Sequence, residues 1–213
     1  MLASGGTVVG GQVSQHWFDA VNRLARHTAW AHEPARLYAT YGVVLFAGLL
    51  LLSWWLARRS GDLRPVAAAL WAPFGALLAL WVNQFLVAAF AEPRPYAVMP
   101  QALVLVHRSS DGSFPSDHAV MAGAVAAGIA LAHRSLANRR LALVAGALAV
   151  LMAFTRVYVG AHFPLDVVAG LLVGALVAVA SFLVVWPLLR RLVGAMTRTP
   201  LRPLLIAGPA QQA

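Results

Sequence analysis

The chain contains no cysteine and no lysine, and charged residues of any kind are scarce. Without cysteine it can form no disulfide, thiol nucleophile or thiolate metal site, and this absence by itself leaves the cellular compartment open. Charged residues make up 11% of the 213 residues and hydrophobic residues 61%, against about 25% and roughly 45–50% in an ordinary soluble domain. This composition indicates an integral membrane protein.

The charge that is present is strongly unbalanced. The formal net charge is +9, and all 16 basic residues are arginine. A nucleic-acid-binding face needs a continuous basic stripe, whereas these arginines lie in short segments beside apolar runs, as topology signals do. We therefore expect membrane lipids and no nucleic acid as partners.

Long apolar runs predict an all-α, polytopic membrane helix bundle with five spans. A span needs about 20 residues, and we place five at residues 37–57, 65–91, 114–133, 141–154 and 164–189. The second should end at Ala91 or Glu92, because Pro93 and Pro95 disfavour helical backbone before them. In the fifth, Gly170 and Gly174 form a small-xxx-small pair that would admit a close neighbouring helix, although chance explains the pair equally well.

The N-terminal segment has a different pattern. Residues 15–30 mix tryptophan and other apolar residues with charged ones, and the first 35 residues lack the uninterrupted apolar core of a secretory signal. This pattern predicts an amphipathic helix that lies at the interface or is partly inserted. The chain is then one domain, residues 1–213, with an interfacial segment at 1–36 and a basic cytoplasmic tail at 190–213.

Arginine positions predict the orientation. They cluster in three segments: Arg58, Arg59 and Arg64; Arg134, Arg139 and Arg140; and Arg190, Arg191, Arg198 and Arg202. The positive-inside rule makes these segments cytoplasmic. Alternation then places the segments around residues 94–112 and 156–166 together on the extracytoplasmic side. The N-terminal segment also falls outside despite its own arginines, which a helix that dips into the outer leaflet without crossing would reconcile.

Three polar clusters therefore meet at one membrane face, and their residues suit a phosphate anion. Arg94 and Arg156 can each fork onto phosphate oxygens. The start of the third span offers free backbone N–H groups and the positive end of a helix dipole, and Ser116 adds a hydroxyl donor. These residues predict a phosphate site.

Two histidines supply the remaining chemistry. Asp166 follows His162 by four residues, so its carboxylate can hold the imidazole in one tautomer and leave the other nitrogen free to attack phosphorus. His118, with an ordinary pKa of about 6.5 for histidine, suits proton donation to the leaving oxygen. Water would then hydrolyse the phosphohistidine.

Two other kinds of site compete with this interpretation. A metal centre would have only His118, His162 and Asp166 as ready ligands, and the nearby arginines would repel a cation; we expect neither metal nor other cofactor. A transporter would carry polar residues near the span centres, whereas these gather at one face. The sequence favours an enzyme facing one compartment.

At these residues the chain resembles the type 2 phosphatidic acid phosphatase (PAP2) superfamily of membrane lipid phosphatases. Its three motifs are matched by Arg94-Pro95, by the run from Pro115 to His118, and by Arg156 with His162 and Asp166. The resemblance implies a metal-independent phosphatase with His162 as nucleophile, His118 as general acid, and both arginines plus Ser116 holding phosphate.

Two departures point to one branch of that superfamily. Val87 stands where the first motif usually begins with lysine, and Asp117 stands where the second usually has glycine. Both look like the bacitracin-resistance branch of undecaprenyl-diphosphate phosphatases, as do Asn83, Glu92 and the amphipathic N-terminal segment. We hypothesise that Arg108 or His107 supplies part of the missing lysine charge, and no role is assigned to Asp117 or Glu92.

The resemblance implies hydrolysis of undecaprenyl diphosphate at the extracytoplasmic face of a bacterial inner membrane, which recycles the lipid carrier of peptidoglycan synthesis. Phosphatidylglycerophosphate and phosphatidic acid are alternative substrates for the same site. Specificity lies in packing among the spans, so the sequence leaves the lipid, its chain length and the oligomeric state open.

Overall fold

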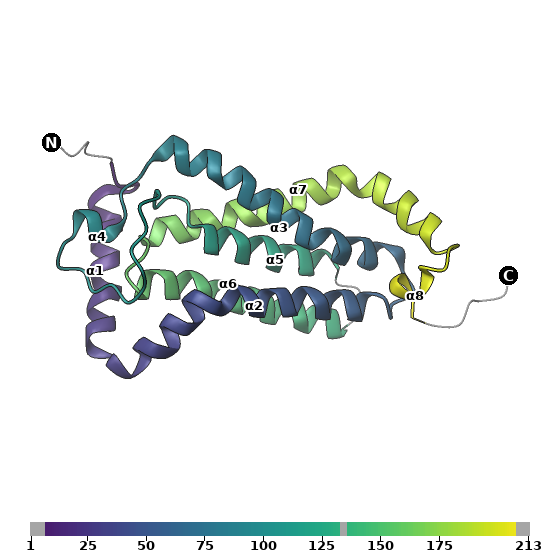
Figure 1. The fold of residues 1–213 in the computed structure, drawn as a ribbon, viewed down its shortest axis with the longest axis horizontal. Helices are drawn as coiled ribbons and strands as arrows, with labels where there is room; N and C mark the ends of the chain where they lie inside the picture. Colours follow the sequence, from purple (N-terminus) through teal and green to yellow (C-terminus); the bar gives the residue numbers. More distant parts are fainter. Residues whose placement is uncertain (1–6, 133–135, 208–213) are drawn as a thin grey trace.

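The computed structural model describes residues 7–132 and 136–207, apart from the side chains of Leu136 and Asn138. In order, its helices are α1 (Gly11–His27), the 3₁₀ turn η1 (Ala29–Ala31), α2 (His32–Ala57), α3 (Leu63–Phe90), α4 (Pro95–Val98), α5 (Asp117–Leu131), α6 (Leu136–Tyr158), α7 (Pro164–Met196) and α8 (Arg202–Leu205). In Figure 1 the long helices run side by side, α1 lies across one end of the bundle and α8 lies at the other. The expected all-α membrane bundle is confirmed.

Among the described residues, four helical segments are long and apolar enough to cross a membrane, and α5 is a shorter apolar helix. The third expected span therefore corresponds to a helix that is shorter than the other four. It begins at Asp117 rather than near Phe114, because the chain from Ser113 to Ser116 is not helical. Its expected end at His133, and Arg134 of the following loop, lie outside the described residues.

Several other helix ends differ from expectation. α2 begins at His32, α6 spans Leu136–Tyr158 and α7 continues to Met196, so each is longer than the charge-free run that predicted it. Arginine side chains near a helix end can extend to the membrane surface while the backbone stays helical. The short helix α4 also interrupts the segment after Arg94, which was expected to be a loop.

The closest helix contact is between α5 and α7. A Cβ atom built on Gly174 would lie 2.0 Å from the carbonyl oxygen of Val120, and one built on Gly123 would lie 2.3 Å from that of Leu171. Both distances are far below van der Waals contact, so only glycine allows the two backbones to approach in this way. The small-residue pair at Gly170 and Gly174 thus admits a neighbouring helix, and that helix is α5.

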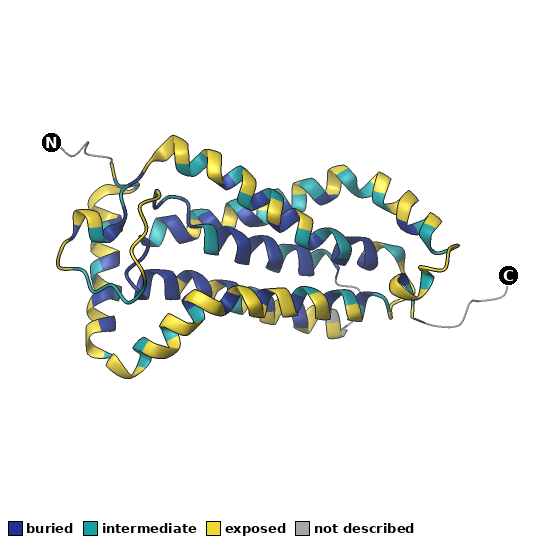
Figure 2. Ribbon diagram, viewed as in Figure 1, coloured by how far each residue is buried: buried dark blue, intermediate teal, exposed yellow. Residues whose placement is uncertain are grey.

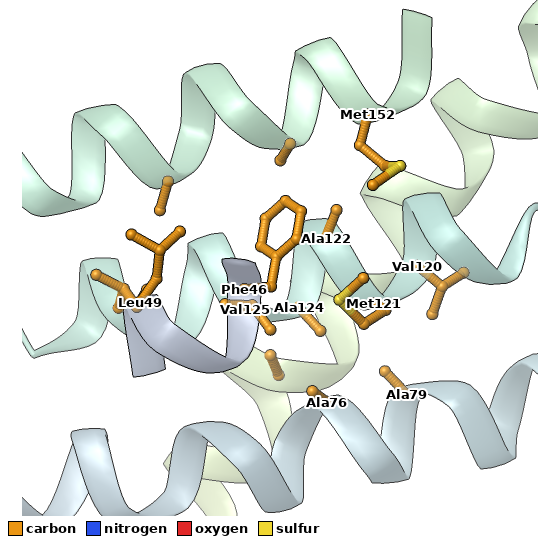
Figure 3. Packing of buried hydrophobic residues seen from close by; sticks show 14 of the residues in the cluster. Phe46, Leu49, Ala76, Ala79, Val120, Met121, Ala122, Ala124, Val125 and Met152 are labelled. Carbon is orange, nitrogen blue, oxygen red and sulfur yellow. The ribbon is translucent and has the colours of Figure 1, made fainter. Parts of the chain in front are cut away.

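The core of the bundle is built mainly from small side chains. Phe46 of α2 and Met152 of α6 fill the space between helices, and alanines such as Ala79 and Ala122 line it (Figure 3). Buried residues follow α5 along most of its length, whereas the outer faces of α2 and α3 are exposed (Figure 2). The central position of α5 fixes its first turn against α3 and α7.

The N-terminal helix α1 is amphipathic, as expected, but it starts at Gly11. One side is buried and carries Ser14, Phe18, Asn22 and Ala25. Next to this side, the helix exposes apolar residues, among them Trp17 and Leu24. The buried side packs on the end of the bundle where α3 and α6 end and α5 and α7 begin (Figure 1).

Candidate active site

The three polar clusters meet at that end of the bundle, although they are separated by up to about seventy residues in the sequence. Arg94 follows α3, Ser113 precedes α5, and His162 lies between α6 and α7. Hydrogen bonds connect Arg94 to His162 and Ser113 to both His162 and Asp166. The convergence expected from counting spans is therefore observed.

The Arg94 guanidinium is buried, and its contacts set its orientation. Nε donates to the backbone oxygen of Asp111 at 3.2 Å, and Nη2 donates to the Asp111 carboxylate at 2.9 Å. Nη1 donates to the carbonyl of Ala161 at 3.1 Å and lies 3.2 Å from Nε2 of His162. One edge of the guanidinium is thus fixed by Asp111, and Nη1 is aimed at the imidazole.

The hydrogen bonds of His162 assign its tautomer. Nδ1 lies 2.9 Å from the carbonyl oxygen of Ser113, and because a carbonyl only accepts, Nδ1 carries the proton. Nε2 is then the unprotonated nitrogen, and it faces Nη1 of Arg94. Burial, followed by the charges of Arg156 and Arg94, holds the pKa of His162 well below its ordinary value. The imidazole is therefore neutral at physiological pH, and the lone pair on Nε2 accepts the Nη1–H of Arg94.

Asp166 has two functions in the structure. Its Oδ2 accepts the backbone N–H of Phe163 at 2.9 Å and so caps the first turn of α7. The same oxygen accepts the Ser113 hydroxyl at 2.5 Å and lies 3.4 Å from Nδ1 of His162. Asp166 therefore stands beside the imidazole as expected, but the shorter contact to Nδ1 comes from Ser113.

Two further phosphate-binding candidates have unused donors. Ser116 is fully buried, and its Oγ has no hydrogen-bond partner among the described residues. Arg156 is also buried, with Nη1 at 3.4 Å from the carbonyl of Ala39 and with Nε unpaired within the described part of the chain. Because buried polar groups are normally paired, these two donors have unused hydrogen-bonding capacity that an anion could take up.

His118 lies in the first turn of α5 and is partly exposed. It lines a pocket of about 370 Å³ together with Asp117, Met121, Val43, Leu80 and Gln84. His162 and the guanidinium groups of Arg156 and Arg94 lie within electrostatic reach of its imidazole. His118 therefore borders both the polar cluster and a pocket formed by α2, α3 and α5.

The structure gives Asp117 a role that its sequence position did not reveal. Its Oδ1 accepts Nδ2 of Asn83 at 2.7 Å and Nε2 of Gln84 at 3.1 Å. Nδ2 of Asn83 also donates to the carbonyl of Pro115 at 3.0 Å. Asp117 thus links the start of α5 to α3, and the two side-chain amides stabilise the carboxylate by donating hydrogen bonds to it.

Glu92 is fully buried beside this cluster. Its backbone oxygen accepts the N–H of Ser113 at 2.8 Å. Neither carboxyl oxygen has a partner within the described residues at standard hydrogen-bond geometry, although the backbone of Val9 lies close enough to interact with the carboxyl. The backbone of Glu92 therefore supports Ser113, while its side chain stays unpaired.

The outer loop places Arg108 away from this cluster. Its guanidinium stacks over the ring of Tyr96 at 5.4 Å, and the hydroxyl of Tyr96 bonds the backbone of Ser109. Asp111 is the loop residue that reaches Arg94. Burial would raise the pKa of its carboxyl, but hydrogen bonds from Ser109 and Arg94 and the charge of Arg94 outweigh it and lower that pKa. The expected contribution of Arg108 to phosphate binding remains a prediction.

Sequence reasoning missed two residues that shape the site. Ser113 orients His162 through its carbonyl and Asp166 through its hydroxyl, yet a serine in a polar run gives no indication of such a double contact. Asp111 could not be identified from spacing, because the loop that brings it back to Arg94 has no regular period. Within residues 7–132 and 136–207, no three His, Asp or Glu side chains gather as metal ligands would.

Comparison with known proteins places this geometry in context. The model of the PAP2 superfamily matches residues 68–190, which include all three motifs. Undecaprenyl-diphosphatase BcrC of Bacillus subtilis is 30% identical over 165 residues, covering 78% of this chain and 80% of that protein. A Bacillus licheniformis protein named bacitracin transport permease protein BcrC is 27% identical over 165 residues, covering 78% of this chain and 77% of its own length.

The fold is also similar to a solved structure. The crystal structure of a transmembrane PAP2-type phosphatidylglycerolphosphate phosphatase from Bacillus subtilis superposes with a TM-score of 0.59. The sequences are 22% identical, and the match covers 88% of this chain and 89% of that one. The helical arrangement around the candidate site is therefore shared with a membrane protein of known structure.

Proposed function

Because this chain belongs to the PAP2 superfamily, we propose that it hydrolyses undecaprenyl diphosphate to undecaprenyl phosphate and inorganic phosphate. One observation carries the proposal. The unprotonated Nε2 of His162 and Nη1 of Arg94 lie 3.2 Å apart in a buried cluster, so a nucleophile and an anion-binding group share one location.

The first half-reaction would transfer the terminal phosphoryl group to His162. Nε2 attacks the terminal phosphorus while the bond from phosphorus to the bridging oxygen breaks. Arg94, Arg156 and the hydroxyl of Ser116 hold the phosphoryl oxygens, and such fixed donors stabilise the charge that develops there. His118 donates its proton to the departing oxygen of the lipid phosphate.

The second half-reaction would release phosphate. A water molecule attacks phosphorus, the bond from phosphorus to Nε2 breaks, and His118, now neutral, takes the proton of the water. Nδ1 donates its hydrogen bond to the carbonyl of Ser113 throughout. Nε2 is therefore both the atom that attacks phosphorus and the atom from which phosphorus is released. Asp166 stabilises the positive charge that the imidazole acquires in the phosphohistidine.

Two pockets support a lipid with a long apolar tail. The pocket beside His118 lies between α2 and α3 at their site ends. Farther along the same two helices lies a second pocket of about 590 Å³, lined by Ala47, Leu50, Leu51, Trp54, Ala69, Leu70, Pro73 and Phe74. With the headgroup at His162, the lipid tail would lie along the apolar surface between α2 and α3, which we call the α2–α3 seam. This surface suits a polyprenyl chain.

The orientation part of the proposal rests on arginine placement. Arg58, Arg59 and Arg64 lie at the bundle end remote from His162, and the positive-inside rule makes that end cytoplasmic. The site would then face outward from a bacterial inner membrane. On that face, Arg108 or His107 would attract the diphosphate. Unchanged turnover in both Arg108→Ala and His107→Ala would exclude this contribution.

The proposal is tested by phosphate release from the purified protein in detergent. Wild-type protein should release phosphate from undecaprenyl diphosphate in the presence of EDTA, whereas His162→Ala should lose at least about 10³-fold in kcat. The three candidate lipids, polyprenyl diphosphate, phosphatidylglycerophosphate and phosphatidate, should be compared on one preparation. Exposed Arg36, paired with Glu33 at 2.7 Å, offers the control variant Arg36→Ala, which should keep full activity.

The outcomes separate the competing functions. Loss of activity in EDTA would favour a metal centre, and preference for phosphatidylglycerophosphate or phosphatidate would assign the same site a different lipid. Absence of phosphate release from all three lipids by folded wild-type protein would remove the hydrolase and leave a transporter, the function named for the Bacillus licheniformis relative.

A further inference from the structure

The buried side of α1 contacts the turn that carries His162, both directly and through the outer loop. We propose that α1 is a positioning element for the nucleophile and that Asn22 is its principal positioning residue. As a contribution to turnover this rests on the proposed hydrolase activity, although the contact itself can be tested without it. Asn22 is 3% exposed and lies in the middle of the helix.

Asn22 binds one residue of the outer loop through both of its amide atoms. Nδ2 donates to the carbonyl of Leu103 at 2.9 Å, and Oδ1 accepts the N–H of Leu103 at 3.0 Å. A side-chain amide that pairs with a residue in both directions fixes its position and its rotation about the chain. Nearby Arg26 donates to the carbonyl of Gln101, so α1 holds the loop at two points.

The loop segment around Leu103, which Asn22 binds, packs against the turn before His162. The N–H of Leu105 donates to the carbonyl of Val159 at 3.0 Å. The carbonyl of Leu103 occupies the space beside Gly160, where a Cβ would lie only 2.2 Å from that oxygen. Gly160 has φ +79°, which glycine adopts without strain. The loop therefore limits the position of the backbone two residues before the nucleophile.

A second contact from α1 holds the other side of the same turn. The ring of Phe18 meets the ring of Phe163 edge-on, with the ring centroids 5.5 Å apart, and both side chains are fully buried. Phe163 directly follows His162, and its N–H is fixed by Asp166. One helix thus braces the residues on both sides of the nucleophile, directly through Phe18 and through Leu103 from Asn22.

Positioning of this kind acts on catalysis more than on binding. A displacement of about 1 Å at a reacting atom can cost on the order of 100-fold in rate. Of the phosphate ligands, Arg94 and Ser116 lie on other elements and Arg156 lies on α6. Arg94 donates to Ala161 in this turn, but its guanidinium is also held by Asp111, so loosening the turn should change substrate affinity less than kcat. The expected signature is a fall in kcat with KM nearly unchanged.

The test compares Asn22→Leu, similar in size but without hydrogen-bonding atoms, with Gln12→Leu, the same type of change at an exposed position of α1. Hydrogen–deuterium exchange of the peptide covering residues 159–163 is measured alongside kcat and KM. Asn22→Leu should exchange faster in this peptide and lose about 10- to 100-fold in kcat, with KM within about 3-fold. Gln12→Leu should match wild type in all three.

If Asn22→Leu does not fold, Asn22→Asp replaces it, because it keeps the size and the acceptor for the Leu103 N–H and replaces the donor by a carboxylate oxygen that repels the Leu103 carbonyl. Unchanged exchange in residues 159–163 would overturn the proposed contact, and faster exchange with wild-type kcat would overturn its effect on catalysis. If wild-type protein hydrolyses none of the lipids, the proposed function fails, while the exchange data still decide whether α1 holds the turn.

Discussion

His162 combines two properties that a phosphoryl acceptor needs. Its tautomer is fixed by the carbonyl of Ser113, and its pKa is lowered by burial and by Arg156 and Arg94. A histidine with an ordinary pKa would be partly protonated just below pH 7, and the protonated fraction could not attack. The arginines that would hold phosphate therefore also keep the nucleophile unprotonated.

The lowered pKa of His162 should make stability depend on pH. In the unfolded chain His162 would titrate near pH 6.5, whereas in the folded protein it stays neutral well below that value. As pH falls through 6.5, the unfolded state gains a proton that the folded state does not, so the free energy of unfolding decreases. Asn at position 162 can retain a donor to Ser113 but removes this titration.

We expect the free energy of unfolding of wild type, relative to His162→Asn, to fall by about 1.4 kcal/mol between pH 7.5 and pH 5.5. Thermal or denaturant unfolding of both proteins in the same detergent would measure the difference. A difference that does not change with pH, or that increases as pH falls, would contradict a neutral buried imidazole.

Helices α5 and α7 carry His118 and Asp166, and the close contact between these helices at Gly174 places both residues at the same end of the bundle. Because a Cβ on Gly174 would lie 2.0 Å from the carbonyl of Val120, Gly174→Ala must force the backbones apart. Overpacking of this kind costs about 1–3 kcal/mol. We expect Gly174→Ala to lower the unfolding midpoint in detergent and to reduce phosphate release.

Gly48 of α2 provides the matched control, since no atom lies within 4 Å of its added Cβ. Gly48→Ala should be neutral or slightly stabilising, because alanine favours a helix over glycine. Equal unfolding midpoints for the two variants would show that the α5–α7 contact does not limit stability.

The elements were more predictable from the sequence than the contacts between them. Apolar run lengths identified the four long helices and the shorter helix α5, and they placed Arg94, His118 and His162 at one end of the bundle. They did not predict the ends of α6 and α7, since arginines continue those helices beyond the apolar run. They also gave no information on Asp111 or Asn22, because the contact of each depends on the path of the outer loop, and loop paths follow no sequence period.

The orientation of the whole molecule in the membrane can be measured by labelling from each side. Absence of cysteine makes the chain suitable for single-cysteine labelling, because every label reports one introduced site. Gln101 lies in the loop at the site end, Ala137 lies near the start of α6 at the opposite end, and both are exposed.

We expect a membrane-impermeant maleimide to label Gln101→Cys from the outside of intact cells and to label Ala137→Cys only after the membrane is permeabilised. This result follows from the arginines at the Ala137 end, which the positive-inside rule places in the cytoplasm. The reverse labelling pattern would invert the molecule and place phosphate release inside the cell.

The glycine contact between α5 and α7 also divides the bundle into parts with different freedom. Two backbones in such close contact act as one rigid frame, so Ser116 and Asp166, which are joined through their backbones at 3.1 Å, should keep their spacing during turnover. The seam between α2 and α3 has pockets and no such contact. We expect this seam to widen as lipids exchange. Helices α5 and α7 would then stay fixed during turnover, while α2 and α3 move apart to admit and release the lipid.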